Sequence, residues 1–267
     1  MSTACERFVV ADYLKQTSEP LFPDIFWNKP INKRAAGSLL MLGGHGQQFS
    51  GLQAVYTLVQ AFGVGTARLV LPDSLRSMVG AMENGVFLPS TPSGSFASSA
   101  AEEAIVMANE HDGVLLPGEL SNNNETTSFL ESLVTNTKSH IFTSGEVIEQ
   151  LLPVPHAIAN IAGFVATPLQ LSRWAKALHV PIYVKTPDLH KEIELLTALG
   201  ELGDQLLISY TPQQIIANYG GEISVTPTND ATLSAVLAAI TVFCLQHTDR
   251  FQAATSGIWQ ATHPRPL

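Results

Sequence analysis

Charged residues are scarce in this sequence. They make up 14% of its 267 residues, against roughly 25% in an ordinary soluble protein. So little charge leaves apolar surface for a second subunit to cover, and we expect a homo-oligomer. Basic residues are fewer than acidic ones. The sequence has 14 Lys and Arg and 23 Asp and Glu, which gives a net charge of −9. Nucleic acids and anionic membranes both require a basic face, so we expect neither as a partner.

Cysteines and long hydrophobic runs are also few. The two cysteines, Cys5 and Cys244, are far apart and match no metal or redox spacing, which predicts a reduced, cytoplasmic protein. The apolar run at 235–245 is too short to span a bilayer, and residues 1–15 lack the pattern of a signal peptide. The 8 histidines show no metal-ligand spacing, so we expect no protein-bound metal.

Short apolar runs alternate with amphipathic helical segments along most of the chain. We expect strands at 37–44, 66–72, 86–89, 113–118, 139–144, 161–168, 181–186 and 204–210, then a hairpin turning at 219–221 and helices at 231–247 and 249–261. This alternation is typical of a mostly parallel, doubly wound α/β sheet with helices on both faces. We predict one such domain at 31–267, preceded by an extended arm at 1–30.

A glycine-rich turn, GGHGQQFSG at 43–51, joins the first long strand to a helix that Ser50 is placed to cap. Gly44 and Gly46 fit the start of a dinucleotide-binding fingerprint. However, Phe49 occupies its third glycine position, and no acidic residue ends the next strand. We therefore interpret the turn as facing some other ligand, with a purely structural turn as the alternative.

A second strand-to-helix turn lies in LLPGELSNNNETT, residues 115–127. Gly118 follows Pro117 at the strand end, and the asparagines at 122–124 are placed to cap the next helix or to leave backbone N–H groups for a ligand.

A third candidate is SVTPTNDATLSAVLAAITVFCL at 224–245, which predicts a strand end, a turn and a long apolar helix. The start of such a helix is an anion site, because its first backbone N–H groups are unpaired. Turns of this kind usually carry glycine, yet none lies between Gly221 and Gly257. Asp230 is the one acidic side chain at a helix start that also follows the long hairpin.

The order of these segments resembles the ADP/ATP-dependent NAD(P)H-hydrate dehydratases, the YjeF C-terminal-like family of the ribokinase-like superfamily. Members begin with H-K-G-x-x-G, a strand and G-G-S. The segment at 32–54 matches at Lys33, Gly37, Gly43, Gly44 and Gly51 and departs at Asn32, Arg34, His45 and Leu52. Later family turns are represented by Gly63 and Gly65, by Pro117 and Gly118, and by Thr167 and Pro168. The family's D-A-D strand end is replaced by residues 143–145.

The most informative family motif is G-[ST]-G-D-x-L-A-G, whose glycines form an anion hole and whose aspartate is the catalytic base. Placed over TNDATLSA at 228–235 without a gap, it keeps Leu233 and puts Ala231 at the aspartate position. A shift by one residue keeps Asp230 as the base but puts Pro227 and Asn229 on the glycines. We favour the ungapped register, and in both the anion hole is impaired, because proline lacks an N–H and threonine crowds the backbone.

The resemblance implies a ribokinase-like fold, a small-molecule nucleotide ligand (ADP or ATP, with Mg²⁺ as an option) and NADPH or NADH as a further ligand. The residues that it implies for binding are Gly43, Gly44, His45, Gly51, Gly118, Thr228 and Asn229, with Asp230 as the candidate base. The degraded motif predicts a divergent hydro-lyase with reduced or lost activity. A nucleotide-binding pseudoenzyme or scaffold, and a small-molecule kinase using Asp230, remain as alternatives.

Overall fold

The sheet of this protein is mostly parallel. The computed structural model describes residues 12–28, 30–46, 48–80 and 85–263, so Cys5 and the start of the arm lie outside the described residues. The strands in this part of the chain are β1 (Leu14–Lys15), β2 (Ser38–Leu42), β3 (Thr66–Pro72), β4 (Gly85–Leu88), β5 (Gly113–Leu116), β6 (His140–Ser144), β7 (Gly163–Ala166), β8 (Leu206–Tyr210), β9 (Gln214–Tyr219) and β10 (Glu222–Pro227). Their order is β1-β10-β9-β8-β7-β6-β5-β2-β3-β4, and β9 alone runs antiparallel to its neighbours.

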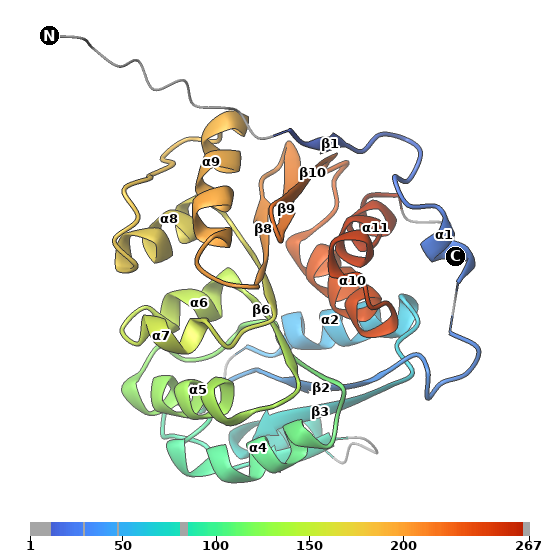
Figure 1. Ribbon diagram of the computed structural model, residues 1–267. Helices are drawn as coiled ribbons and strands as arrows, with labels where there is room; N and C mark the ends of the chain where they lie inside the picture. Colours follow the sequence, from blue (N-terminus) through green and yellow to red (C-terminus); the bar gives the residue numbers. More distant parts are fainter. Residues whose placement is uncertain (1–11, 29, 47, 81–84, 264–267) are drawn as a thin grey trace, which may run out of the picture.

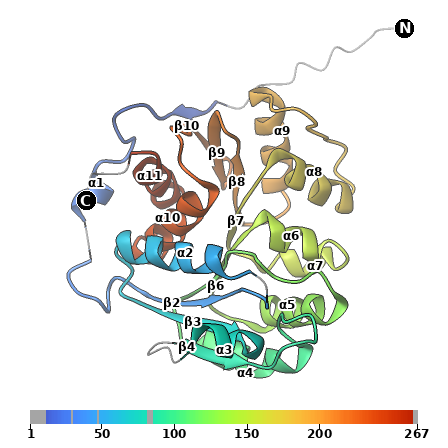
Figure 2. The same ribbon diagram turned by 180° about the vertical axis from the view of Figure 1, so that it is seen from behind.

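Helices cover both faces of this sheet (Figures 1 and 2). One face carries α4 (Ala101–Asn109), α5 (Asn124–Asn136), α6 (Gly145–Leu151), α7 (Pro155–Ile158), α8 (Pro168–Ala177) and α9 (Leu189–Gly200). The other carries α1 (Asp24–Trp27), α2 (Ser50–Ala61), α3 (Arg76–Val79), α10 (Leu233–Gln246) and α11 (Arg250–Thr262). The prediction of one doubly wound α/β domain is confirmed.

Alternation along the strands divides the core into two layers. Leu40 and Leu42 of β2 pack in the layer of α4 to α9, whereas Leu39 and Met41 pack in the layer of α2, α10 and α11. All four are fully buried, because successive strand side chains point to opposite faces. The first predicted strand is therefore central, as its continuous apolar run indicates.

The predicted hairpin forms between β9 and β10. Gly220 and Gly221 have φ angles of +60° and +86°, which glycine adopts without a steric penalty and which suit the tight turns of hairpins. The helices predicted after this hairpin are α10 and α11, which pack against each other. Among the described residues, no helix is long and apolar enough to cross a membrane.

The prediction of a strand at 181–186 is wrong. β7 pairs directly with β8, so the sheet has no place for a strand between them. The segment runs outside the sheet, where the Ser172 hydroxyl of α8 accepts a hydrogen bond from the Val184 backbone nitrogen at 2.9 Å. Its apolar residues join the core of the layer of α4 to α9, because Val184 is buried there and Ile182 packs against it.

The N-terminal arm adds a strand at the edge of the sheet. β1 pairs in parallel with β10, and the Gln16 side chain is only 1% exposed. The Gln16 amide donates hydrogen bonds to the Thr226 hydroxyl and to the Thr255 carbonyl oxygen, each at 3.0 Å. The described part of the arm therefore contains the edge strand β1 and the short helix α1, and Gln16 joins it to β10 and α11.

Candidate functional site

The strand order reverses between β2 and β5, and in open α/β sheets ligands bind at the carboxyl ends of the strands that flank such a reversal. The glycine-rich turn at 43–51 follows β2, and the turn at 117–123 follows β5. A Cβ atom on Gly43 would lie 3.0 Å from the Gly118 carbonyl oxygen. Gly43 and Gly118, two of the predicted binding residues, are therefore in direct backbone contact.

The turn after β2 is held by backbone hydrogen bonds. Gly44 has a φ of +86°, and the backbone of His45 exchanges hydrogen bonds with Gln48 at 2.8 and 3.0 Å. The Gly46 nitrogen donates to the Gly94 carbonyl oxygen at 3.0 Å. The turn is thereby fastened to the loop that follows β4, which fixes the backbone of His45 at the carboxyl edge of the sheet.

A carboxylate from within the chain occupies the start of α2. Glu119 accepts hydrogen bonds from the backbone nitrogens of Gly51 and Leu52, each at 3.0 Å. The expectation that Ser50 caps this helix is wrong, because Phe49 is the N-cap residue and makes no side-chain capping bond. Negative charge is favourable at a helix start, so Glu119 takes the place that an anionic ligand would fill.

Backbone geometry accommodates this contact at both ends. A Cβ atom on Gly51 would lie only 2.7 Å from a Glu119 carboxylate oxygen, so the glycine is required for the close approach. Glu119 itself has a φ of +57°, a left-handed conformation that is uncommon for a residue with a side chain. Sequence analysis missed Glu119. The signal available was an acidic residue directly after Pro117 and Gly118 at a strand end.

Two further polar groups lie beside this contact. The exposed Glu146 carboxylate accepts a hydrogen bond from the Glu119 nitrogen at 3.3 Å. The buried Ser144 hydroxyl has no hydrogen-bond partner among the described residues. In the same turn, Asn123 caps α5 by accepting from the Thr126 nitrogen at 2.9 Å, as predicted for the asparagines. Two carboxylates thus lie at the switch point, and an anion that binds the Gly51 and Leu52 nitrogens must displace Glu119.

Thr228, Asn229 and Asp230 form a separate tight turn after β10. Asn229 and Asp230 have φ angles of +47° and +62°, and the Ala231 nitrogen donates to the Thr228 carbonyl oxygen at 2.9 Å. Two positive φ angles with this hydrogen bond are typical of a type I′ turn. The turn therefore uses one N–H group that an anion hole would offer, and the Thr232 hydroxyl caps another, that of Ala235, at 3.2 Å.

This turn lies at the carboxyl end of β8 rather than at the switch point. The Tyr210 hydroxyl donates to the Ala231 carbonyl oxygen at 2.6 Å, and the Thr228 hydroxyl donates to the Thr211 carbonyl oxygen at 2.7 Å. Strands β5 to β9 separate β2 from β10 in the sheet. The structure thus brings Gly43, Gly51 and Gly118 together and leaves Thr228, Asn229 and Asp230 in a second cluster.

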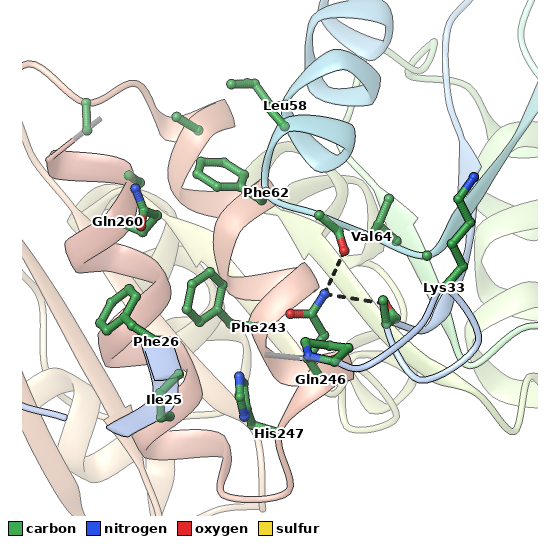
Figure 3. A pocket seen from close by; sticks show the side chains of 18 of the residues that line it. Ile25, Phe26, Lys33, Leu58, Phe62, Val64, Phe243, Gln246, His247 and Gln260 are labelled. Atoms are coloured by element: carbon green, nitrogen blue, oxygen red, sulfur yellow. Dashed lines mark hydrogen bonds between the residues drawn. The ribbon is translucent and has the colours of Figure 1, made fainter. Parts of the chain in front are cut away.

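A groove of about 1010 Å³ runs along α10, between α2 and α11. Figure 3 shows Phe62 and Phe243 side by side at its centre, with Gln246 hydrogen-bonded to the backbone before β2 and after α2. Exposed Asn229 and Asp230 lie at its other end. No group of three or more His, Cys, Asp or Glu that could hold a metal ion is present in the described part of the chain.

No family model matches the sequence, and no curated protein matches it. The structure is similar to a ribokinase-like superfamily protein from Enterococcus faecalis V583, with a TM-score of 0.72 at 11% identity over 94% of this chain and 86% of that one. An ADP/ATP-dependent NAD(P)H-hydrate dehydratase from Bacillus subtilis aligns with a TM-score of 0.59 at 11% identity, over 94% and 88%. Phosphomethylpyrimidine kinase from Clostridium difficile 630 aligns with a TM-score of 0.53 at 12% identity, over 82% and 96%. The protein therefore has the ribokinase-like fold.

Proposed function

We propose that this protein is a divergent relative of the NAD(P)H-hydrate dehydratases that keeps a nucleotide-binding site and has lost most or all dehydratase activity. The observation that carries the proposal is the turn at 228–231. In the ungapped register Asp230 stands at the second glycine of the family motif, and its φ of +62° is a conformation that favours glycine. That register leaves Ala231 where the family has its base.

The chemistry of the family makes these changes severe. Phosphoryl transfer depends on backbone N–H groups that stabilise the charge of the transition state. Here the N–H groups of Ala231 and Ala235 are bound within the chain. Loss of one such donor costs about 10²–10³ in rate, and loss of a general base costs about 10²–10⁴.

Glu119 supports the same proposal at the switch point. Its carboxylate binds the N–H groups of Gly51 and Leu52, and it would repel the phosphates of a dinucleotide. A substrate with a negative charge must therefore break two charge-assisted hydrogen bonds before it reaches the start of α2.

We propose ADP or ATP as the nucleotide, and NADPH or NADH as a weaker ligand. The solved Bacillus subtilis dehydratase was co-crystallised with ATP and Mg²⁺. Magnesium usually keeps several waters and binds through phosphates with one or two carboxylates, so exposed Asp230 is the side chain of the second cluster that fits it.

Thermal unfolding with ADP, ATP or NADPH, each with and without Mg²⁺, tests the binding part. A ligand at ten times its Kd adds about 1.4 kcal/mol of stability. We expect this gain with ADP or ATP. A melting curve unchanged by every ligand would contradict nucleotide binding.

Turnover of hydrated NADPH in the presence of ATP tests the loss of activity. We expect no turnover above the protein-free control. Turnover that Asp230→Ala abolishes and the exposed control Asp204→Ala preserves would overturn the proposal and restore Asp230 as the base.

A non-catalytic scaffold is the second candidate, and the apolar groove along α10 is the observation that favours it. A small-molecule kinase with Asp230 as base is the third, because a solved kinase shares the fold. Phosphate transfer from ATP to a small hydroxylated compound, lost in Asp230→Ala, would favour the kinase. A protein that binds no nucleotide would favour the scaffold.

A further inference from the structure

The groove along α10 is lined mainly by apolar side chains, some buried in the core and some partly buried and packed against it. Figure 3 shows Leu58 of α2 and Phe62, the residue after α2, on one side, Phe26 of α1 on the other, and Phe243 of α10 between them. An apolar hollow of about 1010 Å³ in contact with water is a typical feature of a binding surface.

Two large apolar side chains project beside this groove. Trp27 is 85% exposed and Ile31 is 97% exposed. They flank the groove-lining residues Phe26 and Pro30 in the sequence. A projection next to a hollow on one surface is self-complementary under a two-fold rotation, because each copy then inserts its projection into the hollow of the other.

Charges at the two ends of the groove have opposite signs. Lys33 lies near the C-terminal end of α10, where Gln246 donates to the Gly63 and Ala36 carbonyl oxygens at 2.9 and 3.4 Å. Asp230 lies at the N-terminal end. The 14 residues of α10 separate these ends by about 21 Å. Both side chains are exposed, and neither takes part in an ion pair within the described residues.

We propose that the occupant of this groove is a second copy of the chain, in an isologous dimer. Antiparallel apposition of two grooves places Trp27 and Ile31 of each copy on the apolar floor of the other. The same rotation exchanges the ends of the groove, so Asp230 meets Lys33 of the partner subunit, and this contact occurs twice. Charge complementarity and the paired projection and hollow both lead to this arrangement.

This dimer goes beyond the proposed function, because it changes what surrounds the turn at 228–231. The partner subunit's Lys33 brings a positive charge to a turn whose polar side chains at the groove are those of Asn229 and Asp230. A lysine at that place would attract the phosphates of a nucleotide. Nucleotide affinity is then expected to fall with dissociation of the dimer, and by linkage a bound nucleotide is expected to stabilise the dimer. The dimer itself is measured without nucleotide, so its absence and a failure of nucleotide binding are distinguishable.

Sedimentation velocity and light scattering across a dilution series test the interface. The wild-type chain is expected to have twice its mass of 28.7 kDa. Trp27→Ser is expected to raise the dimer dissociation constant at least about tenfold, because buried tryptophans are common hot spots. Tyr183→Ser, the matched control at an exposed aromatic residue far along the chain, is expected to leave it unchanged.

A charge exchange tests the orientation. Lys33→Glu alone and Asp230→Lys alone each juxtapose like charges twice and are expected to raise the dissociation constant at least about tenfold. The double variant is expected to return it to within about threefold of the wild type. Lys185→Glu, at an exposed lysine outside the groove, is the control for net charge, and circular dichroism checks the fold of each variant.

Three results would overturn the dimer. They are a wild-type chain that stays monomeric at the highest concentration, a dimer that Trp27→Ser leaves intact, and a double charge variant no tighter than the single ones. A monomer whose groove binds a fluorescent apolar dye that ADP or ATP displaces would assign the groove to the nucleotide instead.

Discussion

A carboxylate oxygen of Glu119 lies 3.0 Å from the backbone nitrogen of Gly51, although the two residues are 68 positions apart in the chain. This contact joins the turn after β5 to the first turn of α2, across the point where the strand order reverses. A carboxylate of the chain itself therefore supplies the negative charge at this switch point, and this has consequences for stability and for anion binding.

Removal of the Glu119 carboxylate is expected to lower the free energy of unfolding by about 1–2 kcal/mol, as for loss of a helix cap. The same Glu119→Ala variant frees the N–H groups of Gly51 and Leu52 for another anion. Inorganic phosphate should then raise the melting temperature of Glu119→Ala and leave the wild type unchanged.

Glu103→Ala removes an exposed acidic residue from the first turn of α4 and is the control for this measurement. Equal effects of phosphate on wild type and Glu119→Ala would mean that Glu119 does not block the start of α2.

The effect of Gly51→Ala is expected to change sign with the residue at 119. In the wild type the new methyl group displaces Glu119 and breaks its two hydrogen bonds, which should cost about 1 kcal/mol. In the Glu119→Ala background the contact is absent, and alanine should stabilise the helix by up to about 1 kcal/mol because of its higher helix propensity.

Urea unfolding of the four proteins in this double-mutant cycle measures the coupling between the two positions. Additive effects would show that the two residues do not interact in solution.

The left-handed backbone at Asp230 predicts an unusual order of substitutions. Asp230→Gly should change stability by no more than about 0.5 kcal/mol, because glycine relieves the φ of +62° and offsets its own entropic cost. Asp230→Val should cost about 1–2 kcal/mol, because a β-branched residue is strained there.

Thermal unfolding of both variants measures this difference. Equal losses in the two would mean that the side chain of Asp230, rather than its backbone conformation, stabilises the turn.

A buried carboxyl predicts a dependence of stability on pH. Glu192 is 1% exposed and accepts a hydrogen bond from the Ser209 hydroxyl at 2.7 Å. Burial, the main cause, raises the pKa of Glu192 above its usual 4.5. The folded state therefore binds the proton more tightly than the unfolded state, and stability falls as the pH rises from about 4.5 through the raised pKa.

Glu192→Gln removes this titration while nearly preserving the shape of the side chain. Urea unfolding across this range should give a stability difference between the wild type and Glu192→Gln that becomes less favourable to the wild type as the pH rises. A difference that is constant with pH would contradict the raised pKa.

Local patterns predicted most of the fold, because the periodicity of a strand or helix and the turn at Gly220 and Gly221 are determined by residues close together in the sequence. The segment at 181–186 has the composition of a strand, yet its exclusion depends on the direct pairing of β7 with β8. The Glu119 contact likewise depends on how distant segments pair in the sheet. An acidic residue after Pro117 and Gly118 is visible in the sequence, but its partner at Gly51 is defined only by the strand order.

The parallel pairing of β1 with β10 has a consequence for the order of events during synthesis. Leu14 and Lys15 leave the ribosome early, yet their partners, Ser224 and Val225, are made about two hundred residues later. Pairings between distant segments form slowly, because a long loop must be closed before they contribute stability. During synthesis β1 therefore has no partner until the segment of β10 has been made.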